Sequence, residues 1–104
     1  MAQDFRRAIA RAQGTTAASI LTAGNYDAVI GIRCTNILTE TIKVDVYVVN
    51  SSANYFICKS TPIPPGGSIE LIQGGAKIVL VSGDVLTHDC DTNSALDIWV
   101  SYID

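Results

Sequence analysis

The sequence predicts an all-β fold: a small antiparallel β-sandwich or jelly-roll-like domain of about eight strands, preceded by an N-terminal arm. Apolar residues recur at every second position from Ile42 to Val48, which is the period of a half-buried strand. Similar short segments are separated along the chain by turn-forming glycine, proline, asparagine and serine. The 104 residues suit one domain. An immunoglobulin-like strand order stays open, because strand counting does not distinguish it from a jelly roll.

The N-terminal segment has two possible secondary structures. A helix would place Phe5 and Ile9 on one face. A strand would also place them on one face, but together with two arginines. Helix propensity favours the helix. We expect residues 1–13 to form an arm that docks either on its own domain or on a neighbouring molecule, and residues 14–104 to form the sandwich domain.

The other elements follow in order as strands separated by turns. We expect strands at residues 19–22, 26–38, 42–48, 55–58, 68–73, 77–81, 85–87 and 95–103. The third and fourth of these form a hairpin closed by a loop of about five residues, Asn50 to Asn54. Three prolines between Thr61 and Gly67 exclude a central strand there, because proline has no backbone donor. That stretch is predicted to be an extended connector ending in a Pro-Gly turn.

The strands with the clearest pattern carry apolar residues on both faces. Tyr47 and Val49 lie opposite the inner face of one strand, and Trp99 and Ile103 lie opposite the inner face of the last. Such residues form either a second small cluster under the arm or a subunit interface, and aromatic residues are enriched in interfaces. The residues we expect at interfaces are Phe5, Arg6, Arg7, Ile9, Arg11, Tyr47, Val49, Trp99 and Ile103.

Composition and charge exclude several classes of partner. Only 16% of the residues are charged, against roughly 25% in ordinary globular domains, which favours burial against other chains. A net charge of -3 argues against nucleic acid, and no apolar run is long enough for a membrane helix. Arginines interrupt the N-terminus, so we expect no signal peptide and synthesis in the cytoplasm. The basic head and the acidic tail after Asp84 either pair across subunits or are solvated.

The residues that usually carry chemistry do not form a recognisable site. Cys34, Cys58 and Cys90 include no CxxC pair, and the first two lie in apolar strand patterns typical of small buried residues. The only histidine, His88, precedes Asp89-Cys90-Asp91, for which a solvated polar loop is favoured over a metal site. The sequence therefore predicts no enzyme, no catalytic residue, no cofactor and no metal.

Several stretches carry a resemblance to a known family. They are F-R-R-A-I-A at residues 5–10, V-D-V-Y-V-V at 44–49, N-Y-F-I-C-K at 54–59, T-P-I-P-P-G-G-S at 61–68, K-I-V-L-V-S-G-D at 77–84 and I-W-V-S-Y at 98–102. In this order they resemble the small β-rich virion structural proteins of tailed double-stranded DNA bacteriophages. The match spans nearly the whole chain, and its motifs are structural rather than catalytic.

The resemblance implies a non-enzymatic, homo-oligomeric β subunit of a phage particle. Such a subunit would belong to the neck, tail or baseplate, or would be a capsid cement (decoration) protein. We therefore expect the protein in the virion, with other copies of itself and capsid or tail subunits as partners. The alternative is a host-receptor or carbohydrate-binding module in which Trp99, Tyr47 and Tyr55 stack on sugars.

Overall fold

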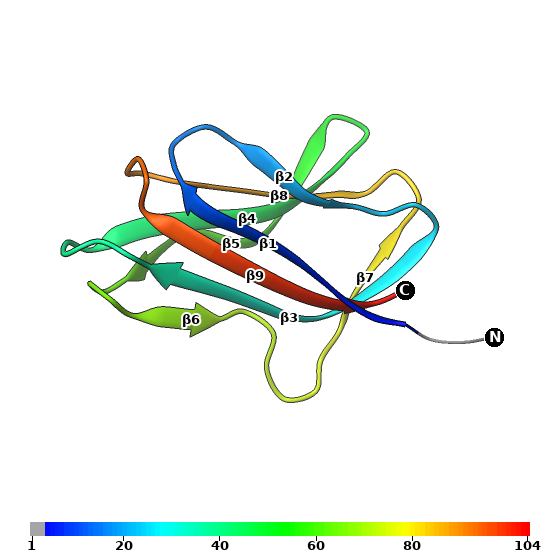
Figure 1. The fold of residues 1–104 in the computed structure, drawn as a ribbon. Coiled ribbons are helices and arrows are strands. Elements are labelled where there is room, and N and C mark those ends of the chain that lie inside the picture. The colour runs from blue at the N-terminus through cyan, green and yellow to red at the C-terminus, as the bar shows by residue number, and fades with distance from the viewer. Residues whose placement is uncertain (1–3) are drawn as a thin grey trace.

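A computed structural model describes residues 4–104 of the protein. In this range the chain forms nine β-strands and no helix, which confirms the predicted all-β fold (Figure 1). In chain order the strands are β1 (Phe5–Gln13), β2 (Ala18–Thr22), β3 (Tyr26–Asn36), β4 (Ile42–Asn50), β5 (Ala53–Ile63), β6 (Ser68–Glu70), β7 (Ile78–Val81), β8 (Val85–Cys90) and β9 (Leu96–Ile103).

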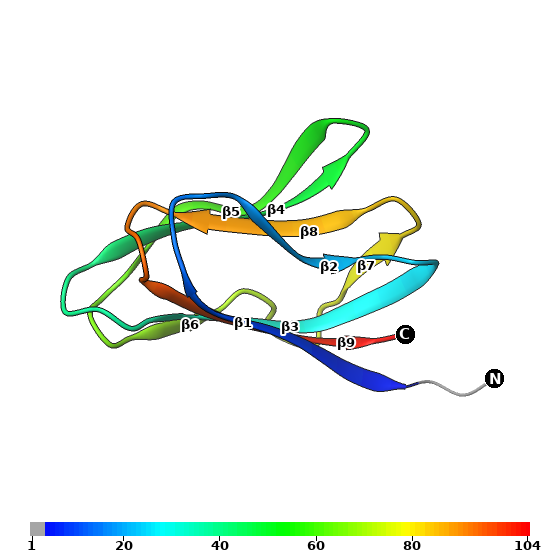
Figure 2. The ribbon, with the colours of Figure 1, turned by 45° about the horizontal axis from the view of Figure 1, so that its top comes forward.

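The strands form two antiparallel sheets that lie over one another as two layers (Figure 2). Sheet A has the order β1-β9-β3-β6, with β7 also paired to β3, and sheet B has the order β2-β8-β4-β5. Strands from the two ends of the chain are therefore neighbours, β1 with β9 and β2 with β8. If β6 and β7 are taken as one interrupted strand beside β3, this is the strand order of a jelly roll.

The core lies between the two sheets and is built from alternate residues of their strands. Its fully buried members include Ile32 and Cys34 of β3, Ile42, Val44 and Val46 of β4, Leu86 of β8, and Leu96 and Val100 of β9. Each fully buried Val, Leu or Ile stabilises the fold by about 1.5–3 kcal/mol relative to exposure. The apolar residues that alternate in residues 42–48 and 95–103 therefore lie on the inner faces of the two sheets, as predicted.

The N-terminal segment forms an edge strand, so the helix that its composition favours is wrong. β1 pairs antiparallel with β9 from Phe5 to Ala10. This pairing lets Ala8 and Ala10 pack against the core, whereas a short helix without packing is marginal. From residue 5 onward the expected arm at 1–13 therefore lies within sheet A, while residues 1–3 lie outside the described residues.

The β4–β5 hairpin closes with a tighter turn than the predicted five-residue loop. Asn50 pairs with Ala53, so only Ser51 and Ser52 lie between the strands, with φ of 51° and 64°. Positive φ at both central residues is typical of a type I′ turn, whose twist matches that of a hairpin. β5 then continues through Pro62, which an edge strand tolerates because the missing donor would face solvent.

β8 continues through Cys90 instead of ending at Thr87, so the first part of the polar loop predicted at residues 88–93 belongs to this strand. Val46 of β4 lies opposite His88. His88 and Cys90 are buried, and Asp89 between them points to the other side of the sheet. Pairing with β4 and β2 on its two sides makes a strand of residues whose local sequence reads as a loop.

Candidate interaction surface

The outer face of sheet A consists of the side chains that point away from sheet B. On β3, β7 and β9 they alternate with buried or half-buried residues, whereas on β1 the intervening residues include the exposed Arg6. This face comprises Phe5, Arg7, Ile9 and Arg11 of β1, Asp97, Trp99, Ser101 and Ile103 of β9, Tyr26, Ala28, Arg33 and Thr35 of β3, and Val79 and Val81 of β7. It holds six of the nine large apolar side chains that are exposed in residues 4–104, so apolar exposure is concentrated here.

Strand register joins part of this face into a continuous apolar row across four strands. Val79 lies opposite Ala28, Ala28 opposite Ile103, and Ile103 opposite Phe5. Val79 and Phe5, at the two ends of the row, are 64% and 76% exposed. An antiparallel sheet facing water normally carries polar residues on that side. A contiguous apolar surface of this kind is typical of an interaction site.

Trp99 lies at the centre of a second row, between Arg33 of β3 and Ile9 of β1. The guanidinium carbon of Arg7 lies 5.2 Å from the centre of the indole ring, within the range of a cation–π interaction. The Trp99 side chain is nevertheless 49% exposed. About half of the indole surface is therefore open to a partner.

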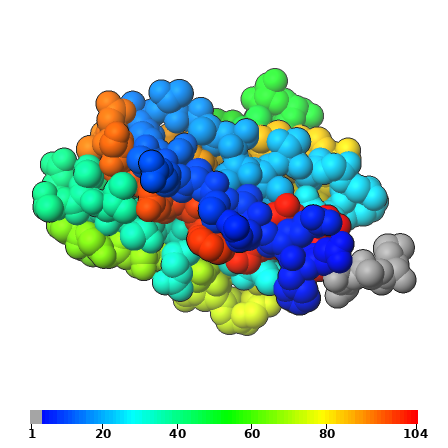
Figure 3. Space-filling view, viewed as in Figure 1, coloured from blue at the N-terminus to red at the C-terminus, as the bar shows by residue number. Residues whose placement is uncertain are grey.

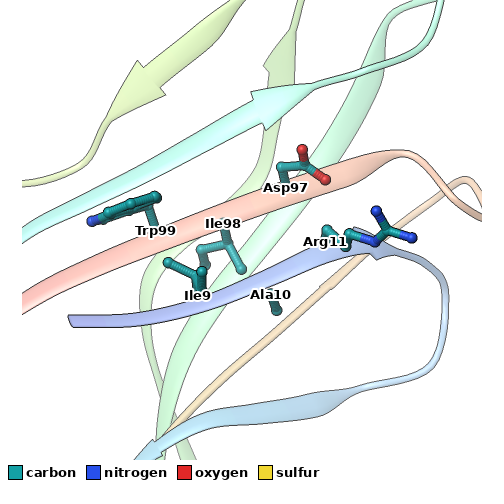
Figure 4. Close-up of a pocket in the computed structure, with 6 residues that line it drawn as sticks. All are labelled: Ile9, Ala10, Arg11, Asp97, Ile98 and Trp99. Atoms are coloured by element: carbon teal, nitrogen blue, oxygen red, sulfur yellow. The ribbon is translucent and has the colours of Figure 1, made fainter.

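A pocket of about 290 Å³ opens beside Trp99, between β1 and β9 (Figure 4). It is lined by Ile9, Ala10, Arg11, Asp97, Ile98 and Trp99. Figure 4 shows Trp99 and Asp97 projecting from one side of β9 and Ile98 from the other. The pocket therefore combines an aromatic ring and aliphatic groups with one side chain of each charge.

A β-bulge in β1 forms one end of this pocket. The register of β1 against β9 shifts between Ala10 and Gln13. Within the bulge Ala12 adopts a φ of 52°, and its N–H donates to Asp97 Oδ1 at 2.8 Å. The Gln13 side-chain amide donates to the Arg11 carbonyl at 2.9 Å. Bulges commonly redirect side chains next to functional sites, and this one holds the Asp97 carboxylate at the pocket rim.

The three arginines of β1 have different surroundings. Arg6 donates to the Asp104 carboxylate at 2.7 Å and to Asp4 at 3.3 Å. From the sequence, the basic head and the acidic tail either pair across subunits or are solvated. For Arg6 the structure shows a third arrangement, an ion pair within one chain. Arg7 and Arg11, on the outer face, form no salt bridge within residues 4–104.

On the outer face of sheet B, Tyr47 and Val49, which are expected to form an interface, are covered by neighbouring side chains, whereas Phe56 on the same face is 44% exposed. Tyr47 is only 7% exposed, and its ring centre lies 4.9 Å from that of Phe56. The Tyr47 hydroxyl donates to Asp89 Oδ2 at 3.4 Å. Val49 is half-buried. The structure therefore brings the other predicted interface residues of β1 and β9 together on one face, but it places Arg6 on the opposite side of β1 and Tyr47 and Val49 on the other sheet.

Asp45 and Asp89 lie directly opposite each other on the outer face of sheet B. Burial raises the pKa of the Asp89 carboxyl, and the hydrogen bond and charge of Asp45 raise it further. Asp45 also accepts the Ser60 N–H at 2.7 Å. Because like charges opposite each other destabilise a sheet, Asp45 favours the protonated form of Asp89. The sequence did not indicate this pair, because its detection requires β8 to continue beyond Thr87.

The remaining groups with chemical potential lie in or near the core. Cys34 is fully buried, as predicted, and burial raises the pKa of its thiol to about 12. Cys58 is half-buried, and burial also raises its pKa. His88 is 1% exposed, neither of its ring nitrogens has a hydrogen-bond partner among residues 4–104, and burial lowers its pKa. Within the described residues, no three His, Cys, Asp or Glu side chains are grouped to hold a metal ion.

Three exposed apolar residues of the outer face of sheet A escaped the sequence-based prediction: Tyr26, Val79 and Val81. Val79 and Val81 alternate with the buried Leu80, so both faces of β7 are apolar. Apolar residues on both faces of a strand are the pattern that identified Trp99 from the sequence, and the same pattern would have identified β7. Tyr26 lies opposite Val81 and extends the face at that end.

Comparison of the chain with protein-family models, with curated proteins and with solved structures gave no match. A search of residues 4–104 found no helix with the length and apolar character that a membrane span needs. The function of the protein is therefore inferred from its sequence and from the geometry of its two sheets.

Proposed function

We propose that the protein is a non-enzymatic structural subunit of a tailed-phage virion. It assembles with other copies of itself and with capsid or tail proteins through the outer face of sheet A. The observation that carries this proposal is the apolar row from Val79 through Ala28 and Ile103 to Phe5. Leaving apolar surface in water costs roughly 25 cal/mol per Å². Assembly into a particle removes this surface from water.

The motif order that resembles tailed-phage virion proteins supports the same function. Jelly rolls occur in viral capsid proteins and also in lectins, so the fold agrees with a particle protein without specifying one. Low charge content and a surface formed by rigid strands suit a repeated building block. Within the particle, these features fit a neck, tail or baseplate subunit and a capsid cement protein equally well.

A carbohydrate- or receptor-binding module is the second candidate, and the pocket beside Trp99 favours it. A half-exposed indole flanked by Arg11 and Asp97 offers a stacking surface together with polar groups. The other two predicted stacking residues do not contribute to this pocket. Tyr47 is buried, and both Tyr47 and Tyr55 belong to sheet B.

The location of the protein in purified phage particles tests the proposed function. We expect a tagged copy to occupy repeated positions at the neck, tail, baseplate or capsid surface. Trp99→Lys should remain folded but be lost from particles, whereas Tyr55→Lys, on sheet B, should still be incorporated. Absence of the wild-type protein from purified particles would contradict the proposal. A saturable change in Trp99 fluorescence with glycans, in a protein absent from particles, would favour the second candidate.

A further inference from the structure

β1 is an edge strand of sheet A, and alternate backbone groups along it have no partner in the sheet that the described residues form. Asp104 N–H donates to the Asp4 carbonyl at 3.0 Å, which sets the phase of the β1–β9 hydrogen bonds. In an antiparallel pair the bonded residues alternate. The N–H and C=O groups of Phe5, Arg7 and Ile9 therefore point to the open edge. In the part of the chain that the structure describes, no strand pairs with β1 on this side, and Figure 3 shows β1 running uncovered across the face in view.

We propose that the open edge of β1 pairs with β1 of a second copy of this chain, antiparallel and about a two-fold axis, so that two A sheets become one continuous sheet. Strand addition at a sheet edge supplies main-chain hydrogen bonds, and a two-fold axis makes the contact self-complementary. This edge pairing is the way in which copies of the chain associate with one another. It therefore rests on the self-association in the proposed function and does not require that the protein belongs to a virion.

The charges of β1 exclude most two-fold registers. With the axis perpendicular to the sheet, residues of the outer face pair with one another. An axis through Arg6 or Arg7 sets that arginine against itself, and an axis through Ile9 sets Arg7 against Arg11. Like charges directly opposite each other are destabilising. An axis through Ala10 would need the backbone of the bulge, where the Arg11 carbonyl already accepts the Gln13 amide.

An axis through Ala8 avoids the like-charge pairs, and its two central hydrogen-bonded pairs do not use the backbone of the bulge. Arg7 then lies opposite Ile9 of the second copy, Arg6 opposite Ala10, and Arg11 opposite Phe5. Arg7 and Ile9 are both edge-facing residues, so each such pair exchanges two backbone hydrogen bonds.

This register also covers the most exposed apolar side chain of β1. Phe5 lies against the aliphatic stem of the second copy's Arg11, and its ring is within reach of the guanidinium. Charges on an edge strand normally discourage pairing. Here like-charge pairs disfavour the registers centred on Arg6, Arg7 and Ile9, whereas the register centred on Ala8 is self-complementary.

Disulfide cross-linking between two chains, each with one introduced cysteine, tests the register. Arg7→Cys and Ile9→Cys are made separately, each with Cys58→Ser, because Cys58 is the half-buried native thiol whereas Cys34 and Cys90 are buried. Directly opposite Cβ atoms are about 4.5–5.5 Å apart, close to disulfide range, and diagonal ones about 7–8 Å apart. We expect the mixture to cross-link at least fivefold more than either chain alone. Equal yields, no cross-link, or the highest yield from Arg7→Cys alone would overturn the proposal.

Proline substitution tests the backbone pairing independently. The Ile9 N–H points to the open edge, so Ile9→Pro removes no hydrogen bond to β9. We expect this variant to keep its thermal unfolding transition and to dimerise at least tenfold more weakly in sedimentation equilibrium, whereas Ile9→Ala dimerises less than tenfold more weakly. Undiminished dimerisation of Ile9→Pro would overturn the proposal, as would a wild-type chain that stays monomeric.

Failure of the edge pairing and failure of the proposed function have different readouts. Trp99→Lys alters the outer face and leaves the β1 edge intact, so the mixed Arg7→Cys and Ile9→Cys chains should still cross-link when both also carry Trp99→Lys. If chains with Trp99→Lys are lost from particles but still cross-link, the defect lies in the outer face and the β1 edge pairing is intact. Normal incorporation without any cross-link would overturn the edge pairing alone.

Discussion

Tyr47 and Trp99 are both aromatic residues on the outward side of a strand that has neighbours on both sides, yet only one of them is open to solvent. Tyr47 is covered by the Phe56 ring on β5 and by its hydrogen bond to Asp89 on β8. Trp99 lies between Ile9 and Arg33, and Arg7 contacts its ring while leaving half of the side chain exposed.

The contrast between the two sheets shows what an apolar residue on an outward strand position means. It indicates an interaction surface only when the residues opposite it on the neighbouring strands leave it uncovered. On sheet B those neighbours are an aromatic ring and a carboxylate, which complete a local cluster. On sheet A the two ends of the apolar row, Val79 and Phe5, are exposed, and Ala28 and Ile103 between them are half-buried.

Removing the two aromatic side chains should produce the largest difference between the sheets. Tyr47→Ala should lower the free energy of unfolding by about 3 kcal/mol, as expected for a buried aromatic residue. Trp99→Ala should lower it by about 1 kcal/mol or less, because half of the side chain is already in water. Urea-induced unfolding of both variants measures the difference. Equal losses would mean that Trp99 is as much a core residue as Tyr47.

His88, on the inner side of sheet B, should make stability depend on pH. Its pKa is lowered by burial, so below the ordinary value of about 6.5 the unfolded chain binds a proton that the folded chain does not. Stability should therefore fall as the pH decreases from 7, by up to about 1.4 kcal/mol per pH unit. His88→Leu should remove this loss.

Asp89 contributes to the pH dependence of stability with the opposite sign, so its effect must be distinguished from that of His88. Its pKa is raised, so its contribution is greatest at low pH and is lost as the pH rises through the folded-state value. Unfolding measured from pH 5 to 7 for wild type and His88→Leu isolates the histidine by difference. Parallel curves for the two proteins would contradict the role of His88.

Relieving the carboxyl pair on the outer face of sheet B should have the smallest effect. Asp45→Asn should raise stability at pH 7 by about 0.2–1 kcal/mol, because Asp89 then ionises without a second negative charge opposite it. The asparagine oxygen can still accept the Ser60 N–H. Asp91→Asn is the matched control: the Lys43 N–H donates to Asp91 and lowers its pKa, so its loss should reduce stability. The prediction is wrong if both variants change stability in the same direction.

The fold was predictable where alternation is strong, and less so where a distant partner decides the structure. The alternation in residues 42–48 and 95–103 identifies β4 and β9 with their inner faces. The segment Phe5–Gln13 has a composition that suits a helix, and it becomes a strand because β9, at the far end of the chain, pairs with it. No local property of the segment contains this information.

The candidate surface was predictable in part for the same reason. Trp99 and Ile103 stand out because both sides of their strand are apolar. The burial of Tyr47 depends on Phe56 and Asp89, which become its neighbours only through the registers of β5 and β8. The same holds for His88, since its burial follows from its position between β2 and β4.

Sedimentation equilibrium of three proteins tests the outer face of sheet A most directly as an assembly surface. Wild type, Trp99→Lys and Tyr55→Lys are compared over a range of micromolar concentrations, with thermal unfolding to verify that each is folded. Both substitutions place a lysine at an exposed aromatic position, but on different sheets. Wild type and Tyr55→Lys should form the same assemblies, and Trp99→Lys should shift to smaller species. A monomeric wild type, or assemblies unchanged by Trp99→Lys, would contradict the account.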